Sequence, residues 1–132
     1  MVRKILYWIS TALLSLMYLV SATMYVTQGD VVRQALGALG YPGYLVPALI
    51  TVKLLGIAAV LSRVNVKLSD LAYAGMFYHL LLAFSAHINA HDYGGAVPAI
   101  AGFLALVASF LTQNVARAKK SPNAPSAALK AV

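Results

Sequence analysis

The chain has no cysteine, only three acidic residues and few charges of any kind, since Asp, Glu, Lys and Arg make up 10% of its 132 residues. Without cysteine it forms no disulfide and has no thiol for redox chemistry. Hydrophobic residues make up 61% of the sequence, which is too many for an ordinary soluble domain of this size. The composition therefore predicts one integral membrane domain.

Four apolar segments are each near the ~20 residues that a helix needs to cross ~30 Å of hydrocarbon. They cover residues 5–27, 44–62, 70–90 and 96–115. We expect an all-α, four-helix transmembrane bundle within residues 1–117, followed by a basic, disordered cytoplasmic tail over residues 118–132. The first segment exceeds the apolar core of a secretory signal, so we expect it to be kept as a span.

The net charge of +7 is concentrated at the ends of these segments, and no aromatic stacking platform accompanies it, so we exclude nucleic-acid binding. Only Arg33 falls on one side of the membrane. Eight basic residues fall on the other side: Arg3, Lys4, Arg63, Lys67, Arg117, Lys119, Lys120 and Lys130. The positive-inside rule then predicts that both termini are cytoplasmic and places Tyr25 near the outer interface.

The outer loop between the first two spans contains DVVRQALGALG, whose apolar residues recur at helical spacing. We expect a short helix that lies in the membrane interface, capped by Asp30 at its start and by Gly40 at its end. Ser69 or Asp70 is expected to cap the third span.

Lys53 lies in the middle of the second span, about 13 Å below its outer end at 1.5 Å per residue. His79 lies equally far from the inner end of the third span, so both residues are near the midplane. Tyr18, Thr51 and Tyr78 fall within a turn or two of that level. We expect these five residues to form a polar, ligand-binding layer.

A lysine at this depth costs about 2.5–3.5 kcal/mol on insertion scales, which makes it a functional candidate. No carboxylate shares its depth. The alternatives are a lysine that is satisfied within the bundle and serves packing, and a side chain that snorkels to the interface. His79 is the candidate for proton handling, and its alternative role is that of a core histidine bonded to a carbonyl group.

A second polar cluster is expected at the outer end of the third span: His87, Asn89, His91 and Asp92. His87 and His91 are four residues apart and would share a helix face, as metal and haem ligands do. Neither a glutamate of the HExxH type nor a cysteine completes such a site. We therefore expect no metal site, and haem is disfavoured.

Two segments resemble the DoxX-like family of small four-helix membrane proteins: LGYPGYLVPALITVKLLG (39–56) and LAYAGMFYHLLLAFSAHI (71–88). They contain a leucine-glycine-aromatic-proline turn, a lysine-glycine pair and a tyrosine-alanine-glycine opening of the third helix. The resemblance extends from Tyr7 to Leu111. It implies a location in the cell membrane, in bacteria the inner membrane, and a bundle that accepts a flat lipophilic molecule or a partner helix.

Members of this family look like subunits of quinone-linked oxidation, accompany resistance to quinones and catechols, or act as a receptor chaperone. Two functions therefore stay open. In the first, a quinone-like ligand binds Lys53, and His79 with Tyr78 or Tyr18 relays a proton, as in a redox-associated subunit or oxidoreductase. In the second, the chain is an accessory or assembly subunit that recognises a partner transmembrane helix. No complete catalytic set is present, and a water-filled path would require a homo-oligomer.

Overall fold

The computed structural model describes residues 1–126, which form five helices and no strand. The helices are α1 (Val2–Thr27), α2 (Gly29–Ala38), α3 (Leu45–Ser62), α4 (Val66–Asn89) and α5 (Tyr93–Ala116). All except α2 are long and apolar enough to cross a membrane. The all-α architecture, the four spans and the short helix after the first span are thus confirmed, and the interfacial position of α2 stays a prediction.

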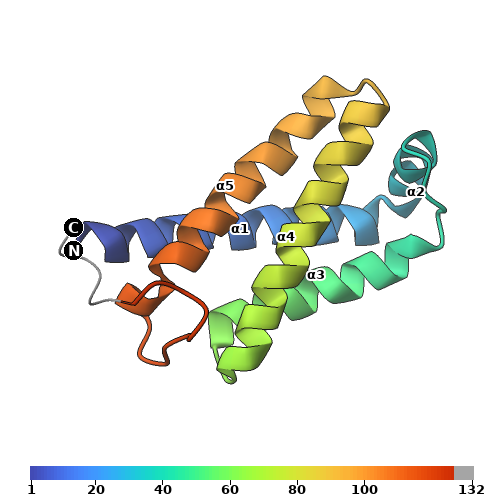
Figure 1. The fold of residues 1–132 in the computed structure, drawn as a ribbon. Helices are drawn as coiled ribbons and strands as arrows, with labels where there is room; N and C mark the ends of the chain where they lie inside the picture. Colours follow the sequence, from blue (N-terminus) through green and yellow to red (C-terminus); the bar gives the residue numbers. More distant parts are fainter. Residues whose placement is uncertain (127–132) are drawn as a thin grey trace.

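The four long helices form a ring in the order α1, α5, α4, α3, because α1 and α4 each pack against both α3 and α5. Figure 1 shows α4 and α5 side by side, crossing α1 obliquely, with α2 beyond the end of α1. The core between them consists of apolar side chains from all four long helices: Leu14, Tyr18, Ile57, Val60, Tyr73, Met76, Leu80, Ala105 and Leu106. Core packing therefore determines which face of each helix turns away from lipid.

Hydrogen bonds between buried side chains connect three of these helices. The Ser109 hydroxyl on α5 lies 2.6 Å from the Thr11 hydroxyl on α1 and 2.7 Å from the Tyr73 hydroxyl on α4. Such bonds contribute about 0.6 kcal/mol each on average in a membrane bundle. They fix the rotation of α1, α4 and α5 relative to one another.

The ends of α2 differ in how well the sequence predicts them. Gly40 has φ +87°, its N–H donates to the Gly37 carbonyl at 3.0 Å, and the Tyr41 N–H donates to the Leu36 carbonyl at 2.8 Å. This pattern is a Schellman motif, so the predicted role of Gly40 is confirmed. The predicted cap at Asp30 is wrong, because the cap position is Gln28 and Asp30 pairs with Arg33 at 3.3 Å.

Helix α4 begins one turn earlier than predicted. Asn65 has an extended backbone, and its side-chain oxygen accepts from the N–H groups of Lys67 (2.8 Å) and Leu68 (3.3 Å). Ser69 and Asp70 therefore lie inside the helix, and their predicted role as caps is wrong. A lysine in the first turn is compatible with the membrane interface because its long side chain reaches back to water.

One end of the bundle, called the basic end here, consists of the start of α1, the α3–α4 link and the end of α5. There the Arg117 guanidinium donates to the Leu61 carbonyl at 2.8 Å and lies 5.5 Å from the centre of the Trp8 ring. Seven of the eight basic residues predicted to share one side of the membrane belong to this end: Arg3, Lys4, Arg63, Lys67, Arg117, Lys119 and Lys120. The eighth, Lys130, lies outside the described residues. That it faces the cytoplasm stays a prediction.

The segment after α5 folds back over the basic end. Asn114 holds it, because the Asn114 amide donates to the Ser121 carbonyl and accepts from the Ser121 N–H, both at 2.7 Å. Residues 118–126 of the predicted tail thus make specific hydrogen bonds in the structure, whereas residues 127–132 lie outside the described residues. The division between a bundle and a tail at residue 117 stays a prediction.

Candidate functional site

Lys53 points into the bundle. It lies on the same stripe of α3 as the buried residues Val46, Ile57 and Val60, and only 5% of it is exposed. Its ammonium nitrogen lies 5.2 Å from the ring centre of Tyr18 and 4.8 Å from that of Tyr25. Aromatic faces attract a cation but accept no conventional hydrogen bond, and Nζ makes no hydrogen bond within residues 1–126. Three strong donors are therefore left without an acceptor oxygen.

Tyr18 also connects Lys53 to His79. The Tyr18 hydroxyl on α1 lies 2.8 Å from Nδ1 of His79 on α4, and their rings are 5.6 Å apart. Nε2 of His79 makes no hydrogen bond to any residue of the described chain. One phenol thus contacts a cation through its ring and an imidazole through its hydroxyl.

These residues line a cavity of about 220 Å³, called the Lys53 cavity here. Its walls are Tyr18, Ser21 and Tyr25 of α1, Lys53 of α3, His79 and His87 of α4, and small residues of α5 that include Gly95, Ala99 and Gly102. No Asp or Glu belongs to this lining. At Gly102, α5 packs closely against α4, because an added Cβ atom there would lie 3.1 Å from Cδ2 of Leu80.

Two of the five residues predicted for the polar layer lie elsewhere. Thr51 is exposed, and its hydroxyl donates to the Pro47 carbonyl of its own helix at 3.0 Å. Tyr78 is 65% exposed and faces the outside of the bundle. Lys53, Tyr18 and His79 are brought together, and Thr51 and Tyr78 are not.

Tyr25 and His87 belong to the cavity, although their positions near the ends of their spans predict the outer interface for both. Helical spacing in the sequence indicates that both residues belong to the cavity. Tyr25 follows Tyr18 by seven residues, and His87 follows His79 by eight, so each pair lies on one face of its helix. The cavity therefore runs along the bundle from the midplane toward the α4–α5 link.

The second predicted cluster is split. Nδ1 of His87 lies 2.9 Å from Oδ2 of Asp92, whereas Asn89 donates to the Ser85 carbonyl and His91 approaches the Tyr93 hydroxyl. Helix α4 ends at Asn89 and His91 has φ 59°, so the expectation that His87 and His91 share a helix face is wrong. Within residues 1–126, no group of three His, Cys, Asp or Glu side chains could hold a metal ion.

The sequence matches the DoxX-like family over residues 9–110, a range that includes every residue lining the Lys53 cavity. The chain belongs to the DoxX-like family. It is accordingly a multi-pass membrane protein with four candidate spans, and the predicted family resemblance is confirmed. No curated protein and no solved structure matches the chain.

Gly95 leaves space for the hydrogen bond between His87 and Asp92 in this DoxX-like protein. A Cβ atom added there would lie 2.3 Å from both Asp92 Oδ2 and His87 Nδ1. We expect Gly95→Ala to break this hydrogen bond and to lower stability by about 1–3 kcal/mol relative to Gly94→Ala, as overpacking does. Gly94 is the matched control because an added Cβ there meets nothing within 4 Å. Equal thermal unfolding of the two variants in detergent would contradict this contact.

The stability of the protein should depend on pH through the Asp92 carboxylate. The hydrogen bond from His87, and then that from the Gly95 N–H, holds its pKa below the usual carboxyl range. A depressed pKa stabilises the fold above the unfolded-state value, about 3.9, and this contribution is lost as pH falls through the folded-state value. The difference in melting temperature between the unsubstituted protein and Asp92→Asn should shrink as the pH falls below about 4 and the carboxylate becomes protonated. A difference that does not change with pH would exclude the ionised carboxylate as its cause.

Proposed function

We propose that this DoxX-like protein binds a small lipophilic molecule with an acceptor oxygen, such as a quinone-like carbonyl compound, in the Lys53 cavity. The observation that carries the proposal is the buried ammonium of Lys53, which lines the cavity and makes no hydrogen bond to an acceptor oxygen within residues 1–126. A buried charged donor that lacks a partner is costly, and a ligand oxygen would remove that cost. The ligand would thus supply what the bundle omits.

The walls of the cavity fit a flat, largely apolar body. Tyr18 and Tyr25 offer aromatic faces, and Ala99 and Gly102 belong to the apolar part of the lining on α5. Aromatic rings stack on such faces in offset or edge-on arrangements. A cavity lined mainly by apolar surface with a few convergent polar groups is the usual form of a small-molecule site.

His79 and Tyr18 add a means of proton delivery at the same cavity. In the tautomer where Nδ1 accepts from the Tyr18 hydroxyl, Nε2 carries the hydrogen and is free to donate to a ligand oxygen. Reduction of a quinone to a hydroquinone takes up two electrons and two protons. Lys53 and the His79–Tyr18 pair could each donate a hydrogen bond to a ligand oxygen, and each could deliver a proton to it if the ligand were reduced elsewhere in its cycle.

Gentle extraction of the full chain from its own membrane tests the proposal. Native mass spectrometry and an ultraviolet-visible spectrum should reveal a bound lipophilic carbonyl compound that is released on denaturation. A protein that carries no small molecule but copurifies with one stoichiometric membrane partner would overturn it. That result would favour the assembly role, in which an acidic side chain of the partner helix reaches Lys53.

A further inference from the structure

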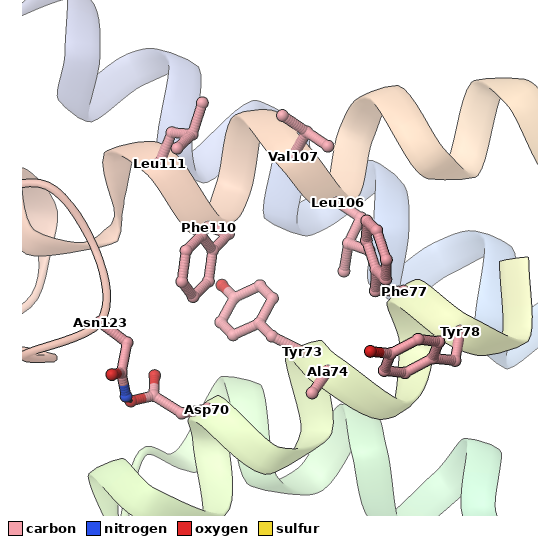
Figure 2. Close-up of a pocket in the computed structure, with 10 residues that line it drawn as sticks. All are labelled: Asp70, Tyr73, Ala74, Phe77, Tyr78, Leu106, Val107, Phe110, Leu111 and Asn123. Carbon is pink, nitrogen blue, oxygen red and sulfur yellow. The ribbon is translucent and has the colours of Figure 1, made fainter. Parts of the chain in front are cut away.

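A second and larger cavity lies on the outside of the bundle. It is a groove of about 430 Å³ between α4 and α5, called the α4–α5 groove here, and it shares no lining residue with the Lys53 cavity. Figure 2 shows its aromatic walls, with Tyr73 and Phe110 at its centre and Phe77 and Tyr78 farther along α4. The groove is a separate place where a ligand could bind.

The α4–α5 groove opens toward the lipid. Its floor consists of the buried residues Tyr73 and Leu106, which belong to the core. Its rim consists of exposed side chains, among them Tyr78 and Leu111. Since α1 and α3 complete the ring on the other side of the bundle, the open side of the groove faces the acyl chains.

Asp70 gives the groove a negative end. Asp70 and Asn123 close it at the basic end, while aromatic and aliphatic side chains line the remainder (Figure 2). Oδ2 of Asp70 accepts from the Ser121 hydroxyl at 2.7 Å and the Asn123 amide at 2.9 Å, whereas Oδ1 is buried and has no hydrogen-bond partner. Asp70 forms no ion pair within the described residues, although lysines and arginines surround this end.

A carboxylate at the head of an aromatic groove is complementary to an apolar body that carries a cationic N–H donor. Charge-assisted hydrogen bonds from an ammonium to a carboxylate are among the stronger ones, and aromatic faces add cation–π attraction. At the basic end, nearby lysines would in turn attract a phosphate. A group that bears both charges fits this end better than an anion alone.

We propose that the α4–α5 groove binds a membrane phospholipid with a primary ammonium head group. The ammonium donates to Asp70, and an acyl chain lies along Phe77, Leu106 and Phe110. We choose a lipid as the ligand because the groove opens sideways to the bilayer. A choline head group lacks the N–H donor, and a glycerol head group lacks the cation, so both should bind more weakly.

Lipid retention by the full chain tests this proposal. The protein is mixed in detergent with palmitoyl-oleoyl phosphatidylethanolamine, phosphatidylcholine or phosphatidylglycerol, and the bound lipid is measured by native mass spectrometry. We expect the ethanolamine lipid to be retained about tenfold more tightly than either of the others, the scale of a charged hydrogen bond. Equal retention, or preference for the glycerol lipid, would overturn the proposal without any variant being needed.

Two substitutions locate the site. Asp70→Asn keeps the shape of the side chain and should abolish the preference for ethanolamine, whereas Asp30→Asn at the opposite end should leave it unchanged. Ala74→Trp should fill the groove and reduce retention of the ethanolamine lipid while leaving the Lys53 cavity as it is. A preference that survives both Asp70→Asn and Ala74→Trp would overturn the assignment. Binding of dodecylamine to the unsubstituted protein without binding of the ethanolamine lipid would contradict the choice of occupant.

Discussion

Replacing Lys53 by methionine is expected to leave the fold intact and to weaken ligand binding in the Lys53 cavity by about tenfold to a hundredfold. The change removes the charge-assisted hydrogen bond to the ligand oxygen, which is worth roughly 1.5–3 kcal/mol. Methionine keeps the length and apolar stem of the side chain, and it removes a charge that costs about 2.5–3.5 kcal/mol in the middle of a span. Stability should therefore stay the same or rise while affinity falls.

The measurement compares the amount of lipophilic compound retained per protein after extraction, together with the melting temperature in detergent. Lys67→Met is the matched control, because Lys67 lies in the first turn of α4 at the basic end and not at the cavity. The control should keep both ligand and stability. A Lys53→Met protein that folds normally and retains the ligand fully would remove the proposed role of the ammonium.

The membrane helices could be predicted because hydrocarbon imposes one strong constraint on length and composition. The depth of Lys53 and His79 followed from counting residues along those helices. Which face of each helix turns inward could not be obtained in the same way. Helix α3 is apolar all round, so its sequence has no polar side that would distinguish lipid from core.

Thr51 shows the consequence of this missing information. At 3.6 residues per turn, a residue two positions from Lys53 points to nearly the opposite face, however similar its depth. Tyr78, next to His79, is likewise rotated away from the cavity. Tyr25 was missed for the converse reason, because its depth suggested an interfacial tyrosine while its face coincides with that of Tyr18. Helical spacing, combined with depth, would have selected the correct tyrosine.

The sequence predicts only a topological role for the charge of Arg63, whereas the structure buries this residue at the basic end with 3% of it exposed. Its guanidinium donates to the Ser69 hydroxyl at 3.2 Å, to the Gln113 side-chain oxygen, and to the Lys119 carbonyl at 3.0 and 2.6 Å. These acceptors come from α4, α5 and the segment after α5. No sequence pattern indicates such a set, since its members are far apart in the chain.

Arg63→Ala is therefore expected to destabilise the protein by about 2–4 kcal/mol, because it leaves several buried acceptors without a donor. Arg63 also has φ 52°, in the left-handed region that glycine tolerates best. Arg63→Gly loses the same hydrogen bonds but relieves this backbone strain, so it should be about 1 kcal/mol more stable than Arg63→Ala. Thermal unfolding in detergent, with Lys67→Ala as the exposed control, separates the two contributions. If Arg63→Ala unfolds at the temperature of the unsubstituted protein, the guanidinium does not hold α4, α5 and the following segment together. If Arg63→Gly is less stable than Arg63→Ala, the backbone conformation at residue 63 is not a source of strain.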